Sequence, residues 1–321
     1  MDPADMPAVS TPLQWHDKSW SELQPLIERE QLPHALLLAG PQYIGKERFA
    51  LALARRLLCQ RPADGFNCGE CHACALSASG VHGDMQWLAP EDKSRVIKID
   101  QVREVVAFAT KTAAFGARKV IVLTPADSMN TNAANALLKS LEEPAADTYF
   151  ILVCHVLHGV PPTIRSRCRI LRPPVPLPDD SLHWLDSLTG ERAESQRLLA
   201  LAEGRPLLAE TLFREGGADL LTARQAALQG LLKGSVTPQE MVRLLEGEST
   251  EQALVQLASG IGVALRALDA GQLPTEHARA SFRLLDEILD IQRAVTAGSN
   301  PNHQLLLEAM LAKLWRLHAA G

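Results

Sequence analysis

Long apolar segments are missing from this sequence of 321 residues. A helix that crosses a membrane needs about 20 consecutive apolar residues, and the chain contains no such run. Its first residues, Met1-Asp2-Pro3-Ala4-Asp5, are acidic, whereas a secretory signal peptide begins with a basic segment. We therefore expect a cytoplasmic protein with no membrane partner.

An excess of positive charge is also missing, because 32 Lys and Arg stand against 37 Asp and Glu and the formal net charge is -5. Proteins that bind nucleic acid through their overall field are usually basic, so any contact with nucleic acid must be local or shared with partners. Aromatic residues make up only 4%, while alanine and leucine are abundant, which favours helix. The length exceeds what one hydrophobic core usually supports, so we expect two or three domains.

The first half of the chain alternates short apolar runs with amphipathic segments, a pattern typical of a parallel sheet with helices on both faces. The helical segments are expected to start after Gly45, at Asp100 as an N-cap, and at Ala133, the last ending before Pro144. The predicted strands are residues 35–39, 85–88, 120–123, 149–153 and 170–171.

The second half shows no strand pattern. The proline-rich residues 172–178 predict a linker, and Gly216-Gly217 marks a second boundary. Between these two points the apolar spacing predicts a small helical domain, and further helices are expected to the end of the chain. The predicted domains are therefore residues 1–172, 173–216 and 217–321.

A phosphate loop follows the first predicted strand, with the sequence Gly40-Pro41-Gln42-Tyr43-Ile44-Gly45-Lys46. Backbone N–H groups of such a loop wrap phosphates at a helix N-terminus, the lysine neutralises them, and a hydroxyl holds magnesium. Here Glu47 stands where the Ser or Thr is needed. Gly40, Gly45 and Lys46 are thus candidates for nucleotide contact in a degenerate loop, and the alternative is an old loop retained only as a turn.

Hydrolysis by a phosphate-loop ATPase also needs acidic residues at the end of a following strand. The strand at residues 120–123 is followed by Thr124 and Pro125, and Asp127 lies beyond the proline. Because neither Thr124 nor Pro125 can hold magnesium or activate water, we expect no ATP hydrolysis by this chain alone.

Four of the six cysteines form the pattern Cys-x8-Cys-x2-Cys-x2-Cys. Clustered cysteines in a reducing compartment are metal ligands more often than disulfides, and four sulfur ligands leave no open position on zinc. We predict a structural zinc site and expect the nearby His72 and His82 to face solvent rather than bind the ion. The predicted zinc ligands are Cys59, Cys68, Cys71 and Cys74.

One arginine, Arg167, lies between a helix-like turn and the last predicted strand, where loops gather at the edge of a sheet. An arginine offered to another subunit's nucleotide can stabilise charge on a transferring phosphoryl group. Spacing alone does not separate this role from a solvated basic strip formed with Arg165, Arg169 and Arg172.

Several motifs together make the chain resemble the clamp-loader ATPases of the AAA+ group. They are Asn135-Ala136-Leu137-Leu138-Lys139-Ser140-Leu141-Glu142-Glu143-Pro144, Ile164-Arg165-Ser166-Arg167-Cys168, and the four-cysteine insert at residues 59–74. The resemblance implies an AAA+ domain in residues 1–172, a helical lid in 173–216 and an all-α collar for oligomerisation in 217–321. It also implies that Leu207 stands where the lid of active subunits carries a sensing arginine.

The same resemblance implies a function and a set of partners. Arg167 would act as an arginine finger in trans, in a ring of five subunits with the gamma/tau motor subunits and the delta subunit. That ring loads a sliding clamp onto primer-template DNA as part of the DNA polymerase III holoenzyme, a DNA-directed DNA polymerase. This chain would be a non-catalytic stator. The rival hypotheses are an active phosphate-loop ATPase of the same fold and a zinc-dependent nucleic-acid binding module.

Overall fold

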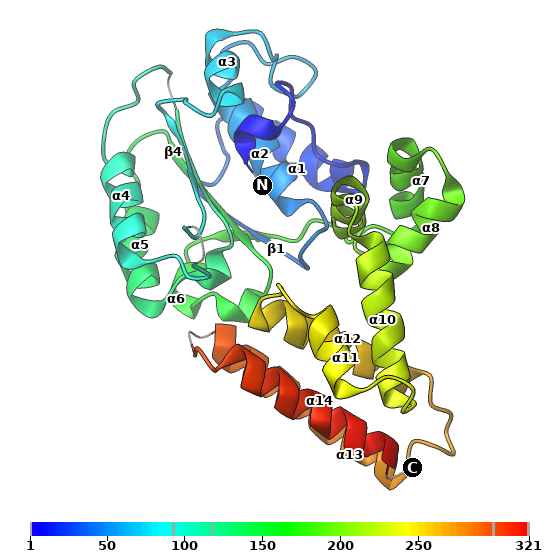
Figure 1. Cartoon of the computed structure of the whole chain (residues 1–321). Coiled ribbons are helices and arrows are strands. Elements are labelled where there is room, and N and C mark those ends of the chain that lie inside the picture. Colours follow the sequence, from blue (N-terminus) through cyan, green and yellow to red (C-terminus); the bar gives the residue numbers. More distant parts are fainter. Residues whose placement is uncertain (1, 92–93, 117, 297–298, 320–321) are drawn as a thin grey trace. The chain divides into compact units, whose positions relative to one another are not determined.

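The computed structural model of this chain describes residues 2–91, 94–116, 118–296 and 299–319. Its backbone contacts divide the chain into two compact units, Met1–Glu210 and Thr211–Gly321 (Figure 1). Within the described ranges, no helix has both the length and the apolar character that crossing a membrane requires. The predicted boundaries after residues 172 and 216 remain predictions, and the first of them falls inside the first unit.

The first unit is built on a parallel sheet of five strands in the order β2-β3-β4-β1-β5. All five strands coincide with the apolar runs predicted from the sequence, to within one or two residues at the ends. The central strand β1 pairs Leu37 with Leu152 of β4 on one side and with Ile170 of β5 on the other. The strands are β1 (Ala35–Ala39), β2 (Met85–Leu88), β3 (Lys119–Leu123), β4 (Thr148–Cys154) and β5 (Arg169–Leu171).

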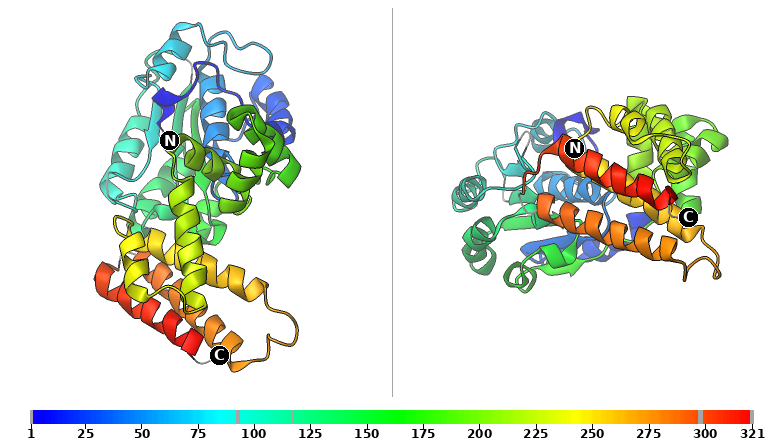
Figure 2. Two further views of the ribbon diagram at one scale, coloured as in Figure 1. Left: turned by 45° about the vertical axis from the view of Figure 1, so that its right-hand side comes forward. Right: turned by 60° about the horizontal axis from the view of Figure 1, so that its bottom comes forward.

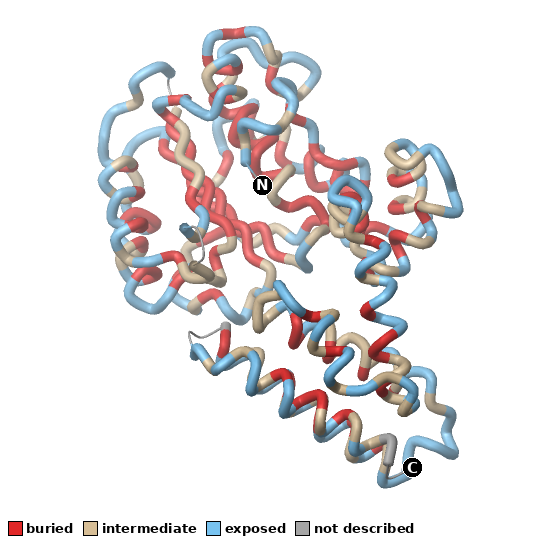
Figure 3. Tube along the Cα trace, in the orientation of Figure 1, coloured by how far each residue is buried: buried red, intermediate tan, exposed pale blue. Residues whose placement is uncertain are grey.

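Helices cover both faces of this sheet, as the continuous apolar strands predicted. Alternate side chains of β1 point to opposite faces: Leu37 packs with helices α4 and α5, whereas Leu36 and Leu38 pack with α1 and α2. Figure 3 shows the central strands as the most continuously buried part of the unit. The helices between the start of the chain and β5 are α1 (Asp17–Glu28), α2 (Lys46–Leu58), α3 (His72–Ala78), α4 (Ile99–Ala109), α5 (Thr131–Glu142) and α6 (Pro162–Arg165).

The start of α4 corrects the sequence prediction. Asp100 is not the N-cap but lies within the first turn, and the N-cap is Lys98. The side-chain oxygen of Gln101 accepts a hydrogen bond from the Lys98 backbone N–H at 3.0 Å, so a capping-box contact fixes the helix start two residues earlier. In α5, by contrast, the predicted stop before Pro144 is confirmed, and Asn130 caps the start by accepting from the Ala133 N–H at 2.8 Å.

The remaining described elements of the first unit are helical. The longer helices come after the start of the predicted linker and include the beginning of α9, which continues past residue 210, whereas the short 3-10 helices all precede the linker. The longer ones are α7 (Pro178–Thr189), α8 (Arg192–Leu201) and α9 (Pro206–Glu215), and the short 3-10 helices are η1 (Pro3–Asp5), η2 (Gln14–His16), η3 (Ala126–Ser128) and η4 (Leu157–Gly159).

The second unit is helical throughout its described residues. Its core is a layer of leucine, isoleucine and methionine side chains from every helix, among them Leu228, Leu257, Ile288 and Leu311. The two long helices α13 and α14 run side by side (Figure 2). The helices are α10 (Ala218–Leu232), α11 (Pro238–Leu244), α12 (Thr250–Arg266), α13 (Glu276–Thr296) and α14 (His303–Ala319).

Candidate functional site

The phosphate loop joins β1 to α2, the strand-loop-helix context that the sequence predicted. Gly45 has φ +96°, and a Cβ atom there would lie 2.4 Å from Cδ1 of Leu13, so both the backbone and the packing require glycine. The Lys46 side chain is buried. Its Nζ donates to the Pro41 carbonyl within the loop and lies 3.2 Å from Nδ1 of His155. The three predicted nucleotide-contact residues, Gly40, Gly45 and Lys46, therefore lie in one loop whose lysine is engaged by the protein itself.

The surroundings of two histidines beside this lysine disfavour the charged form of the imidazole. Burial, and then the charge of Lys46, lowers the pKa of His16 to about 4. The same two causes lower the pKa of His155. Burial also lowers the pKa of Lys46 itself, to about 8. The loop thus holds its ammonium group in a poorly hydrated pocket, where the charged form is less favoured than in water.

The residues at the expected magnesium position contact each other. The Thr124 hydroxyl at the end of β3 donates to Oε1 of Glu47 at 2.9 Å. Asp127, the nearest acid after the strand, accepts from the backbone N–H groups of His155 and Val156 at 2.9 and 3.0 Å. Its carboxylate therefore caps the end of β4 with both oxygens.

An aromatic contact that the sequence analysis missed connects the phosphate loop to α7. Trp15 donates from Nε1 to the Ile44 carbonyl at 2.8 Å, and its ring meets that of Trp184 edge to face at 5.7 Å. The guanidinium of Arg48 lies 5.6 Å from the Trp184 ring centre and forms an ion pair with the largely buried Glu210. We call Trp15, Trp184, Arg48 and Glu210 the aromatic clamp. No local sequence pattern marks this contact, because Trp15 lies well before the phosphate loop in the sequence and Trp184 lies in α7.

A second link between α9 and the phosphate loop involves Leu207, the position at which the resemblance implied a missing sensing arginine. Its backbone N–H donates to the Tyr43 carbonyl at 3.2 Å. The leucine side chain has no charge to offer a phosphate. The contact at this position is therefore made by the backbone.

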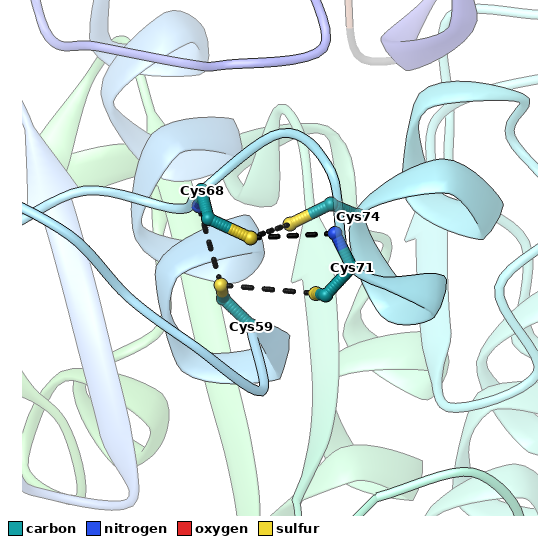
Figure 4. A group of neighbouring side chains, drawn as sticks. All are labelled: Cys59, Cys68, Cys71 and Cys74. Carbon is teal, nitrogen blue, oxygen red and sulfur yellow. Dashed lines mark hydrogen bonds between the residues drawn. The ribbon is translucent and has the colours of Figure 1, made fainter.

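The four predicted metal ligands lie together (Figure 4). Their sulfur atoms are all within 4.8 Å of one another. The Sγ atoms of Cys59 and Cys71, and those of Cys68 and Cys74, are 3.9 Å apart. Four sulfur atoms at the usual Zn–S distance of about 2.3 Å lie about 3.8 Å apart in a tetrahedron. The arrangement could therefore hold a metal ion.

Neighbouring polar groups orient this cysteine cluster. The backbone N–H groups of Cys68 and Cys71 each point at a cluster sulfur at 3.3 Å, and Asn67 donates from Nδ2 to Cys74 Sγ at 3.5 Å. Arg55, buried in α2, donates to carbonyl oxygens of Pro3 and Ser77. The Arg55 bonds fasten the N-terminal segment and α3 to α2 beside the cluster.

The two histidines near the cysteine cluster differ in their exposure to solvent. His72 is exposed, as expected. His82 is buried, with 5% of its surface accessible, so its predicted exposure is wrong. Its Nδ1 accepts from the Asp84 backbone N–H at 3.0 Å, and its ring packs on Phe115. The sequence did not reveal this because the residues beside His82, Val81 and Gly83, are those of a surface turn.

The side chain of Arg167, in the loop between α6 and β5, is held by hydrogen bonds to α5 and α6. Its Nε donates to Oε1 of Glu142 at 2.6 Å, Nη2 contacts the same oxygen, and Nη1 donates to the Thr163 carbonyl at 2.8 Å. One third of the side chain remains exposed. Arg169 and Arg172 are both exposed, and Arg165 is half-buried, so the four arginines do not form one uniform solvated strip.

Comparisons with known proteins identify the family. The family described as "DNA polymerase III, delta subunit" matches residues 15–175. The delta' subunit of DNA polymerase III from Pseudomonas aeruginosa is 37% identical over 96% of this chain and 98% of its own length, and that from Escherichia coli is 36% identical over 70% and 66%.

A solved structure supports the fold. A gamma subunit-related protein of DNA polymerase III from Thermotoga maritima superimposes with a TM-score of 0.51 and 18% identity, over 93% of this chain and 99% of that one. This likeness shows the fold alone, and it agrees with the AAA+ type of parallel sheet expected from the resemblance to clamp-loader subunits. The family match over half of the chain and the 37% identity to the Pseudomonas aeruginosa protein over nearly its whole length show that this chain belongs to the family of DNA polymerase III delta' subunits.

Proposed function

We propose that this chain is the non-catalytic delta' subunit of a DNA polymerase III clamp loader, a stator that serves the ATP site of a neighbouring motor subunit. The observation that carries the proposal is the hydrogen bond between Thr124 and Glu47. Phosphate-loop ATPases hold magnesium between a loop hydroxyl and a carboxylate at the strand end. In this chain the carboxylate of Glu47 lies in the loop and the hydroxyl of Thr124 lies at the strand end, and the two groups hydrogen-bond to each other.

The other catalytic positions agree with this reading. Lys46 is bonded within its own loop, and Asp127 is bonded to two backbone N–H groups. No residue beside β3 is left to activate water, among those that the structure describes. These contacts favour the stator over the rival hypothesis of an active ATPase, although they leave room for nucleotide binding without hydrolysis.

The aromatic clamp supports a rigid role. It joins the phosphate loop to α7 and α9 through an edge-to-face pair, a cation–π contact and an ion pair. Edge-to-face pairs contribute about 0.5–1.5 kcal/mol each. Side chains of this chain therefore already connect the phosphate loop to these two helices.

Arg167 is proposed as the arginine finger. Its side chain is partly exposed in the loop between α6 and the edge strand β5 and is held by two elements, α5 and α6. An arginine finger supplied by a neighbour is worth about 10³ to 10⁵ in rate. The proposed neighbours are a gamma/tau motor subunit and the delta subunit of a five-membered ring.

For the cysteine cluster we propose a structural zinc ion. Four sulfur atoms with near-tetrahedral spacing match the preference of zinc for thiolate ligands. With four protein ligands the ion has no open coordination position, so it would stabilise the fold and not act in catalysis. A nucleic-acid binding role for this module has no specific support, because the chain is acidic. The sliding clamp and primer-template DNA are proposed to be reached through the assembled complex.

The test is a loader reconstituted from motor subunits, the delta subunit and this chain. Arg167→Ala should lower clamp- and DNA-stimulated ATPase partially, because one of the ring's sites is affected, and should lower clamp loading more strongly. Arg169→Ala, an exposed arginine two residues away, is the matched control and should behave as the wild type. Equal and small effects of both substitutions would show that Arg167 does not act in trans. Turnover of ATP by the purified chain would instead favour the rival ATPase.

A further inference from the structure

Glu142 is the last residue of α5, and it contacts the proposed arginine finger at two nitrogen atoms. One oxygen, Oε1, accepts from Nε of Arg167 at 2.6 Å and also contacts Nη2. On the other side, Nη1 donates to the Thr163 carbonyl at 2.8 Å and to the Ser166 hydroxyl at 3.3 Å. We propose that Glu142 is a positioning residue, which holds the guanidinium of Arg167 in the orientation needed to meet a neighbour's phosphate. This proposal rests on the trans-acting role of Arg167.

The geometry of the pair explains why a carboxylate is needed. An arginine side chain has several rotatable bonds, and a planar guanidinium recognises a phosphate only when its N–H groups point the right way. The Thr163 contact alone fixes one nitrogen atom. Contact of Glu142 with Nε and Nη2 fixes the opposite edge, so the plane of the group is defined by α5 and α6 together.

The pair is also weak enough to be exchanged. The side chain of Glu142 is 46% exposed and that of Arg167 33%, and ion pairs in such surroundings contribute little to stability. A triphosphate carries more negative charge than a carboxylate and can accept from two guanidinium N–H groups through separate oxygens. Glu142 can therefore orient Arg167 before the neighbour's ATP arrives and release Nη2 to a phosphate oxygen afterwards.

A purely structural role for the pair is the competing explanation. Arg167 lies by the C-terminal end of α5, where a cation is favoured by the helix dipole, and the contact also joins α5 to α6. Glu143 offers a matched control because it is the next residue, is exposed, and has no side-chain contact with Arg167 among the described residues. Any effect of charge at the end of α5 should be shared by both glutamates, whereas positioning of Arg167 should depend on Glu142 alone.

The experiment uses the complete reconstituted loader with sliding clamp and primed DNA. We compare Glu142→Ala, Glu142→Gln, Glu143→Ala, Arg167→Ala and the double variant Glu142→Ala/Arg167→Ala. Misplacing a catalytic group by about 1 Å can cost about 100-fold, so Glu142→Ala is expected to lower kcat for clamp loading about tenfold or more. KM for ATP should stay within about twofold, because the finger acts on the transition state. Glu142→Gln retains an acceptor oxygen and should lie between Glu142→Ala and wild type.

The double variant tests whether Glu142 acts through Arg167. If it does, the double variant should be no slower than Arg167→Ala alone. A further loss in the double variant, or an equal loss with Glu143→Ala, would overturn the inference in favour of a structural or general charge effect. Wild-type rates for Glu142→Ala and Glu142→Gln beside a slow Arg167→Ala would overturn the inference and leave the finger intact. Wild-type rates for Arg167→Ala would overturn the finger itself and the inference with it.

Discussion

Removing the ring of Trp184 should loosen the connection between the phosphate loop and α7. Trp184→Ala deletes the edge-to-face contact with Trp15, at 5.7 Å, and the contact with Arg48, at 5.6 Å. The first is worth about 0.5–1.5 kcal/mol and the second about 0.5–1 kcal/mol. We therefore expect the free energy of unfolding to fall by about 2 kcal/mol.

A double-mutant cycle isolates the aromatic contact from the other effects of each substitution. Trp15→Ala alone also removes the hydrogen bond to the Ile44 carbonyl, so the single variants cannot be compared directly. Urea unfolding of the wild type, Trp15→Ala, Trp184→Ala and the double variant should give a coupling free energy of about 1 kcal/mol.

The control cycle pairs Trp15→Ala with Leu188→Ala, a half-buried position one turn further along α7. Its coupling should be within about 0.3 kcal/mol of zero, as for independent sites. If the Trp15–Trp184 coupling is equally small, the two rings do not hold the loop to α7 in solution. The argument that the clamp supports a rigid stator would then be wrong.

Three further outcomes are expected. Metal analysis of the purified chain should find one zinc ion per chain, and Cys71→Ser should lose it together with much of the folding stability, because a four-thiolate site contributes folding free energy; a fully folded, metal-free wild type would contradict the site. Steady-state assays of the isolated chain should show no ATP hydrolysis above background, and Glu47→Ser alone should not create it, because Thr124 and Pro125 directly follow β3 and the carboxylate of Asp127 is bonded to two backbone N–H groups; turnover that vanishes with Lys46→Ala would contradict this. Burial lowers the pKa of Lys46 from 10.5 to about 8. Between pH 8 and pH 10.5 the unfolded chain therefore binds more protons than the folded chain, and the free energy of unfolding rises with pH by about 3 kcal/mol in total. Unfolding curves of Lys46→Met measured between pH 7 and pH 10 should lack this rise, and a pH dependence equal to that of the wild type would show that Lys46 is not desolvated.

The sheet could be read from the sequence because its strands are buried on both faces. Leu36, Leu37 and Leu38 need no alternation when helices cover both sides. Helix starts were harder to predict from the sequence, as the N-cap of α4 shows. Lysine is not an ordinary N-cap residue, and Lys98 takes this position because its backbone N–H bonds to the side chain of Gln101. The cysteine cluster was found because its ligands are close in sequence and their spacing is characteristic of a metal site.

Contacts between residues distant in sequence could not be found in this way. Trp15 and Trp184 carry no local pattern that marks them as partners, and their meeting depends on how α7 packs on the phosphate loop. The pairing of Glu142 with Arg167 is hidden for the same reason, although both residues lie in motifs that the sequence analysis singled out. The burial of His82 likewise depends on Phe115, which comes from another loop.

The exchanged pair of Thr124 and Glu47 also constrains how such a chain could change over evolutionary time. Changing Glu47 first to the hydroxyl residue of an active loop leaves two hydroxyls facing each other and no carboxylate for a cation. Changing Thr124 first to aspartate sets a second negative charge against Glu47 where the present side chains are 2.9 Å apart, and like charges at that range repel strongly. Neither single substitution therefore gives a better site for magnesium. The arrangement of an active phosphate-loop ATPase can be regained only if Glu47 and Thr124 change together.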